Sequence, residues 1–198
     1  MSGVFSILLL TIGWGAEDLP SGFERGVRAS DEKSAFGILG NELRYKLDRI
    51  GEATRAGRWS LYLSGYDVHL PYSYSAEQRH RLNSIPWGGG IARSVTDADG
   101  DMHEVYAMGF SDSHYHAQFT AGYVWTRLRK LGDSGSAVGW GYTAFFYSRR
   151  DIANYLPLPG LLPVVTLRYR DVEITGTFIP RFGTVQGDTV YFFSRIRF

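Results

Sequence analysis

The spacing of apolar positions changes once along the chain, from a helical period before residue 57 to strict alternation after it. In the first part, apolar residues recur at helical spacing at Phe36, Leu39, Leu43, Leu47 and Ile50. Such spacing predicts an amphipathic helix that begins at Ser34 and ends before Gly51. A helix of this kind packs on a globular core or lies at a membrane surface.

From Arg58 onward the alternation of apolar and polar residues is the pattern of β-strands. The predicted strands cover residues 58–73, 85–96, 102–112, 119–129, 137–148, 156–170, 172–181 and 189–198. Turn-forming segments such as "DADGD" and "RFGTVQGD" separate them. Eight strands of about ten residues are typical of a small closed barrel. We therefore predict an all-β fold, with eight antiparallel strands after the helix.

Several predicted strands have one face of large and one face of small side chains. Within 119–127, large Phe119, Tyr123 and Trp125 alternate with Thr120, Gly122, Val124 and Thr126. The same rule gives Tyr106, Met108 and Phe110 to the large face of the third strand. It gives Tyr62 to the large face of the first strand. Because the large face has no polar counterpart, we expect it to contact lipid in a transmembrane β-barrel, around a small and nearly apolar lumen. A soluble lipocalin-like barrel is the structural alternative.

Composition supports many short strands, since 15% of the residues are aromatic and 24 are glycine. The net charge of +1 gives no argument for a nucleic-acid partner. The N-terminal stretch "VFSILLLTIGWGA" is too short to span a bilayer as a helix. We interpret residues 1–16 as a signal peptide, with a buried core segment as the alternative. The expected organisation continues with a polar segment and the helix over 17–57 and the barrel over 58–198.

Polar residues with catalytic chemistry fall at the ends of the first and third predicted strands. His69 and Ser113 lie on the inward phase of these strands, and Asp112 precedes Ser113. The two strands run in the same direction in an up-and-down barrel, so their ends share a rim. A hydroxyl, an imidazole and a carboxylate are the groups that acyl transfer requires. Taken singly, each could equally be an ordinary loop or core residue. His114 and His116 without further ligands are a weak metal motif, and we expect no metal.

Six stretches of the sequence match one protein family in its order. They are "IPWGGGIA", "VYAMGFSDS", "AGYVW", "ANYLPLPGLLP", "TFIP" and "VYFFSRIRF". On these stretches the chain resembles the lipid A palmitoyltransferases of the PagP type. The resemblance implies an outer-membrane barrel with a periplasmic helix that moves an acyl chain from the sn-1 position of a glycerophospholipid to lipid A. It assigns the catalytic roles to His69, Asp112 and Ser113, needs no cofactor, and implies a monomer or weak homodimer.

The chain departs from the family pattern at two places near these residues. His114 stands where the family usually has an aromatic residue, and Ser64 replaces a proline of the first strand. A non-catalytic lipid-binding or structural barrel remains the functional alternative. A structural barrel should have a lumen packed with charged, hydrogen-bonded side chains, which the small inward residues argue against. A lipid-binding or transport barrel is separated from the enzyme only by the Asp, Ser and His set.

Further residues are expected to contact substrates. Arg79, Arg81 and Arg150 lie in predicted outer loops, where they could bind lipid A phosphates or be solvated charges. Proline weakens pairing between strands. Pro163 and Pro180 are therefore expected to flank a lateral opening between the sixth and seventh strands, and Pro86 a second opening opposite Ser64.

The length of the transferred chain is expected to depend on the inward residues of the fourth strand. Val124 stands where the palmitate-selective pattern of the family has glycine, which predicts selection of a chain shorter than palmitate. Nearby Gly122, Gly139 and Gly141 could instead enlarge the pocket and cancel this effect.

Overall fold

The computed structural model of the protein describes residues 23–150, 153–181 and 188–198. The predicted signal peptide, residues 1–16, lies outside the described residues. The chain divides into two compact units, one ending at residue 46 and the other covering residues 47–198. The second unit contains the barrel and carries the chemistry considered below.

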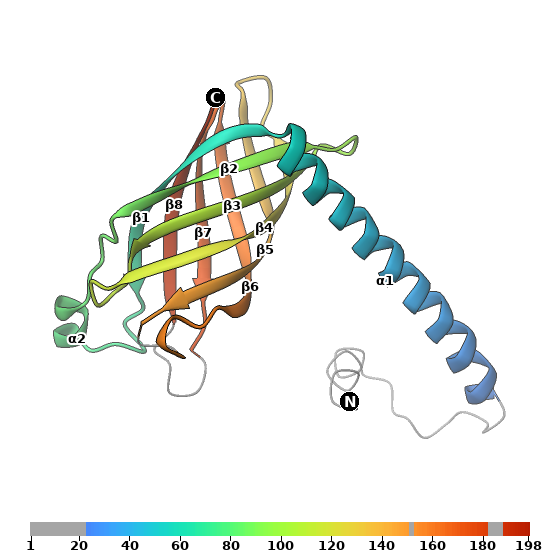
Figure 1. Ribbon diagram of the computed structural model, residues 1–198, viewed down its shortest axis with the longest axis horizontal. Coiled ribbons are helices and arrows are strands. Elements are labelled where there is room, and N and C mark those ends of the chain that lie inside the picture. The colour runs from blue at the N-terminus through green and yellow to red at the C-terminus, as the bar shows by residue number, and fades with distance from the viewer. Residues whose placement is uncertain (1–22, 151–152, 182–187) are drawn as a thin grey trace. The chain divides into compact units, whose positions relative to one another are not determined.

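In the described part of the chain, eight antiparallel strands pair in sequence order and close when β8 pairs with β1 (Figure 1). The strands are β1 (Arg58–His69), β2 (Gly88–Thr96), β3 (Asp101–Ser111), β4 (Ala117–Lys130), β5 (Ser136–Arg149), β6 (Leu158–Tyr169), β7 (Val172–Ile179) and β8 (Thr189–Arg197). This confirms the predicted fold. The largest differences are that β1 ends at His69 and β2 begins at Gly88. The short helix α2 (Ala76–Arg81) and its flanking turns connect them.

Helix α1 (Phe23–Ala56) is longer at both ends than the predicted helix. Ser34 and Gly51 are therefore interior residues, because a glycine within a helix costs only about 1 kcal/mol and this stretch contains no proline. The apolar residues Leu39 and Leu43 are exposed. None of the described helices is both long enough and apolar enough to cross a bilayer.

The last turn of α1 is held by β2. The guanidinium group of Arg93 donates hydrogen bonds to the carbonyl oxygens of Thr54, Arg55 and Gly57. These carbonyls have no partner within the helix, so an arginine at this position satisfies them.

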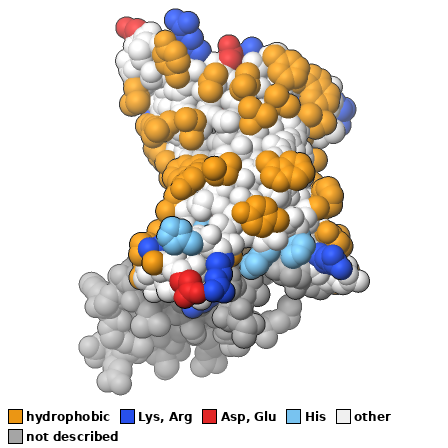
Figure 2. Space-filling model, turned by 90° about the vertical axis from the view of Figure 1, so that its left-hand side faces the viewer, with side chains coloured by type: hydrophobic (Ala, Val, Ile, Leu, Met, Phe, Trp, Pro, Cys, Tyr) orange, Lys and Arg blue, Asp and Glu red, His pale blue; other side chains and the backbone are white. Residues whose placement is uncertain are grey.

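The outer face of the barrel carries exposed large apolar side chains on all of the described strands except β3. Exposed examples are Leu61, Ile91, Phe119, Trp140, Phe146, Leu161, Val165, Leu167, Ile174 and Phe192. Figure 2 shows hydrophobic side chains across the middle of one face, with charged side chains toward its ends. An apolar band between polar ends is the surface of a barrel that spans a membrane. On β4, Phe119 of the predicted large face is exposed, whereas Tyr123 is buried and its hydroxyl lies 2.7 Å from Nδ1 of His103.

The predicted faces of β3, and of the first half of β1, are wrong. Tyr62 is buried inside the barrel, where its ring stacks on Tyr106 at 5.5 Å and on Phe193 at 5.3 Å. Met108 is buried beside them. Alternation separates two faces but cannot say which one is inside, and these aromatic residues fill the interior. A bulge between Ser64 and Tyr66 then reverses the phase of β1.

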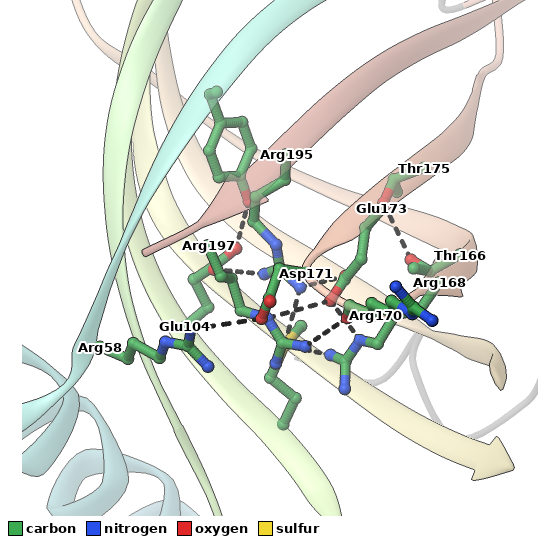
Figure 3. A network of polar contacts seen from close by, with 12 residues as sticks. Arg58, Glu104, Thr166, Arg168, Arg170, Asp171, Glu173, Thr175, Arg195 and Arg197 are labelled. Carbon is green, nitrogen blue, oxygen red and sulfur yellow. Dashed lines mark hydrogen bonds and ion pairs between the residues drawn. The ribbon is translucent and has the colours of Figure 1, made fainter. Parts of the chain in front are cut away.

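The half of the interior nearest the chain's C-terminus is charged, which corrects the expectation of a nearly apolar lumen. Arg195 lies between Glu104 and Glu173 and pairs with both, and Arg168 also pairs with Glu173 (Figure 3). The hydroxyl of Tyr62 donates to Glu104. We call these five residues the floor network. All of them belong to strands, and both glutamates are almost fully buried.

Two ladders of the barrel are incomplete toward the α2 end. β1 pairs with β2 only over residues 58–63, and β6 pairs with β7 only over residues 164–169. Pro163 is the first β6 residue beyond the paired stretch, and Pro180 directly follows β7. Pro86 was predicted to lie in the second strand, but it is a buried residue two positions before β2. The ladder gaps themselves occur on the predicted pairs of strands.

Candidate active site

His69 is the last residue of β1 and lies inside the rim of the barrel. Tyr62 points inward, so strict alternation would place residues 67 and 69 on the outer face. The bulge reverses the phase of the strand, and both residues therefore point inward. The imidazole is 5% exposed and contacts the ring of Tyr74 edge-on, at 5.1 Å between centroids. The turn that follows β1 therefore fixes the plane of the ring.

Ser113 lies in the tight turn between β3 and β4, which Asp112 organises. The carboxylate of Asp112 accepts hydrogen bonds from the backbone N–H groups of His114, at 2.7 Å, and His116, at 2.8 Å. The backbone N–H of Asp112 donates to the carbonyl of His116 at 2.8 Å. Aspartate forms such turns readily because its short side chain reaches the backbone two residues on. This turn presents the hydroxyl of Ser113 toward β1.

The structure brings His69 and Ser113 together. Nε2 of His69 lies 3.3 Å from Oγ of Ser113. β1 and β3 are separated by β2 elsewhere, but β2 begins only at Gly88 and leaves the ends of its neighbours free to approach. The intervening segment joins them instead, because Asp67 N–H donates to Ser84 and Asn83 N–H donates to Ser113, both at 2.9 Å.

Asp112 does not complete a chain with His69 in the described structure. Its carboxylate is 1% exposed and forms an ion pair with Arg149 at 3.0 Å, in addition to the two backbone contacts. Nδ1 of His69 is buried and has no hydrogen-bond partner among the described residues. The predicted trio is thus assembled at one rim, but Asp112 supports the turn of Ser113 rather than the imidazole.

Three residues of the site were not assigned to it from the sequence. Asn83 is buried and its amide donates to Ser111 Oγ at 3.0 Å. Arg149, at the end of β5, neutralises Asp112. Asp67 approaches Ser113 Oγ at 3.5 Å. The inward phase of Asp67 was visible in the sequence, whereas no pattern indicates the contacts of Asn83 and Arg149.

The inward residues of β4 lie deeper in the barrel. Val124 is 5% exposed, and Gly122 lies one inward position nearer the rim. A Cβ atom on Gly122 would lie 2.4 Å from the carbonyl oxygen of Ala144 in β5. The glycine is therefore required by the close approach of two strands.

The three predicted phosphate-binding arginines lie on the rim loops but are not gathered around His69. Arg79 donates to the carbonyl of Tyr74 at 2.9 Å, and Arg81 pairs with Glu77 on the surface of α2. Arg150 is exposed just after β5. Both Arg81 and Arg150 are exposed to solvent.

A further rim contact joins the turn after β1 to Asp188, the residue before β8. The hydroxyl of Ser73 donates to Asp188, and Arg181 lies 3.8 Å from the same carboxylate. The Ser73 hydrogen bond and, to a smaller extent, Arg181 hold the pKa of the Asp188 carboxyl below its usual range. The contact ties the turn after β1 to the start of β8.

The described residues contain no group of three His, Asp or Glu side chains that could hold a metal ion. What they do contain is an imidazole, a hydroxyl and two carboxylates at the rim of a closed barrel with an apolar outer face. This combination defines a membrane-type β-barrel with a candidate acid–base site at one end.

The family follows from comparison with known proteins. The family described as "Antimicrobial peptide resistance and lipid A acylation protein PagP" matches residues 49–195. The chain belongs to the PagP family. The fold and the family together are consistent with an outer-membrane protein.

Relatives from several bacteria carry the same name, "Lipid A acyltransferase PagP". A protein of Bordetella pertussis (strain CS) is 38% identical over 150 residues, which are 76% of this chain and 81% of that protein. One from Methylobacillus flagellatus is 35% identical over 153 residues, again 76% and 81% of the two chains. One from Legionella pneumophila serogroup 1 is 36% identical over 151 residues, 75% and 78% of the two chains.

Proposed function

We propose that this protein is an outer-membrane acyltransferase that moves a fatty acyl chain from the sn-1 position of a glycerophospholipid to lipid A. The family and the names of the relatives support the acceptor and the reaction type. The observation that carries the proposal is the 3.3 Å contact between His69 Nε2 and Ser113 Oγ at the rim. It places an imidazole against a hydroxyl at one end of a barrel whose outer face is apolar.

In the proposed reaction His69 acts as general base. It accepts the proton of the lipid A hydroxyl as that hydroxyl attacks the donor ester carbonyl. The ester C–O bond then breaks, and the proton passes to the oxygen of the departing lysophospholipid. An ester donor is already activated, so no cofactor takes part. General base catalysis contributes about 10²–10⁴ in rate, which is the scale expected for loss of His69.

The ladder gaps provide the proposed path for lipid. A diacyl lipid cannot cross a polar rim with its chains first, but it can enter between strands that are not hydrogen-bonded. Residues 158–163 of β6 form no ladder pairs with β7, although the Thr177 hydroxyl donates to the Pro163 carbonyl at the edge of the gap. This stretch of β6 is largely apolar. We assign phospholipid entry to this gap, and the gap beyond residue 63 of β1 to lipid A.

The rim cations suit the proposed acceptor. Arg81 and Arg150 are exposed on the loops that surround the site, and guanidinium groups bind phosphates through two parallel hydrogen bonds. Arg79 is committed to the Tyr74 carbonyl and supports the turn beside His69. Phosphate binding is therefore assigned first to Arg81 and Arg150.

Mass spectrometry of lipid A tests the proposal. Lipid A from cells that produce the protein should gain the mass of one acyl chain compared with lipid A from cells without it. Isotopic label placed in the sn-1 chain of the donor should appear in lipid A, and label in the sn-2 chain should not. An unchanged lipid A mass, with the folded protein present in the outer membrane, would refute the proposed function.

A structural, non-catalytic barrel is the second candidate, and the floor network favours it. Buried charged side chains fill the interior near Arg195, as expected for a barrel without a ligand pocket along its whole length. The two candidates differ at the rim alone. Lipid A that gains no acyl chain in the presence of the folded wild-type protein would leave only the structural role.

A further inference from the structure

The hydroxyl of Ser113 donates to the carboxylate of Asp67, whereas the carboxylate of Asp112 accepts from backbone N–H groups. Oδ2 of Asp67 lies 3.5 Å from Oγ of Ser113, and Asp67 is 8% exposed on the inner face of β1. Its backbone is fixed by the hydrogen bond from its N–H to the carbonyl of Ser84 at 2.9 Å. Asp67 and His69 are therefore two successive inward residues that both approach one hydroxyl.

The number of available protons determines which groups donate and which accept in this arrangement. The Ser113 hydroxyl has a single proton, and a carboxylate can only accept. When Ser113 donates to Asp67, its oxygen is left to accept a hydrogen bond from His69 Nε2. The ring then carries its proton on Nε2, and the lone pair is on Nδ1. Nδ1 has no hydrogen-bond partner among the described residues, which is compatible with this tautomer.

Asp112 cannot take over this role in the described geometry. Its carboxylate accepts two backbone hydrogen bonds and pairs with Arg149. The charged groups whose fields reach Asp67 are Arg149 and Asp112, and the titratable group that acts on His69 is His114. Arg149 and Asp112 carry opposite charges and act on Asp67 in opposite directions.

We infer that Asp67 is a positioning residue of the site: its carboxylate holds the hydroxyl of Ser113 and, through that hydroxyl, the tautomer of His69. The inference rests on the proposed function for its kinetic consequences but not for the tautomer. Ser113 is then a link between a carboxylate and an imidazole, and the negative charge of Asp67 favours the protonated form of His69 during the reaction.

The first test reads the tautomer directly and needs no substrate. Nitrogen-15 spectra of the histidine-labelled protein in detergent micelles are recorded for wild type, Asp67→Ala and Asp67→Asn, with His69→Gln to assign the signals among the five histidines. We expect the Nε2–H form of His69 in the wild type and a mixture of both tautomers in Asp67→Ala. A His69 spectrum that is the same in wild type and Asp67→Ala would overturn the inference.

The second test is kinetic. Asp67→Ala should lower kcat at least about tenfold with little change in KM for the donor, because positioning acts on the chemical step. Asp67→Asn keeps an acceptor oxygen without the charge, so it should recover most of kcat while the acid limb of its pH–rate profile moves to lower pH. A residue of structural importance alone would give an unshifted profile, which would contradict the proposed role.

Asp133→Asn is the matched control, since Asp133 is exposed in the turn between β4 and β5 at the other end of the barrel. Heat-modifiable gel mobility verifies that each variant is folded. If wild type shows no transfer to lipid A, the proposed function fails, while the tautomer spectra still decide whether Asp67 positions Ser113 and His69.

Discussion

At one end of the interior Arg195 lies between Glu104 and Glu173, and at the other end Ser113 lies between His69 and Asp67. In both, a central residue lies between two polar partners inside the same barrel. Arg195 of the floor network meets a full negative charge on each side. At the rim a neutral hydroxyl with one proton lies between an imidazole at 3.3 Å and a carboxylate at 3.5 Å.

The strands around the two groups differ in how completely they are paired. Around the floor network, the β1–β2 and β6–β7 ladders are paired, and around the rim both are interrupted. Backbone pairing that is complete favours a rigid element, while unpaired stretches open at lower free energy. The difference teaches that buried charge by itself does not indicate a catalytic site. The rim is the candidate active site because its groups can exchange protons and because the interrupted ladders beside it can admit lipid.

The largest effect on activity is expected at the rim. His69→Ala should lower the rate of acyl transfer by about 10²–10⁴ because the general base is lost. The unfolding midpoint should stay within experimental error of the wild type. Transfer is measured in detergent with a labelled donor, and gel mobility reports folding. A near-normal rate would remove His69 from the mechanism.

The largest effect on stability is expected at the floor network. Arg195→Met leaves Glu104 and Glu173 buried without their common partner, which should lower the free energy of unfolding by about 3–5 kcal/mol. Denaturant titration in detergent measures this. The control replaces all three residues, with Glu104→Gln and Glu173→Gln added to Arg195→Met, and should recover much of the loss. A loss that stays the same in the triple variant would show that packing, not charge, is responsible.

Closing the β6–β7 gap should block entry without touching either polar group. The register places Leu162 opposite Ile179, one inward position beyond the last paired residues, and the chain has no native cysteine. Oxidised Leu162→Cys/Ile179→Cys should lose transfer and regain it on reduction. Thr166→Cys/Thr175→Cys is the control, because it joins the same strands where they are already paired. Undiminished transfer in the oxidised first variant would exclude this gap as the donor's entrance.

The preferred length of the donor acyl chain should depend on the depth of the barrel interior between the rim and the floor network. Val124 is buried on the inner face of β4, so Val124→Gly should shift the preferred donor toward longer chains. Each methylene admitted is worth about 0.8 kcal/mol, or about fourfold in preference. A series of donors with defined chain lengths measures the shift. Identical optima for the two enzymes would mean that Val124 does not limit the chain.

The smallest effect is expected at the Ser73–Asp188 contact of the rim. The pKa of Asp188 is lowered in the folded protein, chiefly by the Ser73 hydroxyl. Stability from this contact is therefore present above the ordinary carboxyl pKa of about 3.9 and is lost as the pH falls through and below it. Ser73→Ala should lose less stability than the wild type on acidification from pH 6 to about pH 3. Thermal unfolding across this range is the measurement, and parallel curves for the two proteins would contradict the assignment.

Much of the fold could be predicted because it depends on local patterns. The alternation and turn residues gave all eight strands, most with ends within two residues of the structure. The interior could not be predicted in the same way. Tyr62 and Tyr106 lie inside because they stack on each other and on Phe193, and alternation carries no information about such contacts. The bulge after Ser64 reverses the phase of β1, so even-numbered residues face inward before it and odd-numbered residues face inward after it.

The site was predictable where it depends on strand ends and on family resemblance. His69 and Ser113 meet as expected, although the axes of β1 and β3 should be about 10 Å apart. The late start of β2, which permits the contact, is not visible in the sequence. The same holds for Asn83 and Arg149, whose roles arise from loops and strands that are distant in the chain.

The most direct test of the account compares Ser113→Ala with Arg195→Met in one experiment, with transfer rate per folded molecule and unfolding free energy measured on the same preparations. The account predicts that Ser113→Ala loses transfer at unchanged stability. It predicts that Arg195→Met loses stability while its folded fraction still transfers the acyl chain to lipid A. Transfer by Ser113→Ala at the wild-type rate would contradict the assignment of the rim as the active site.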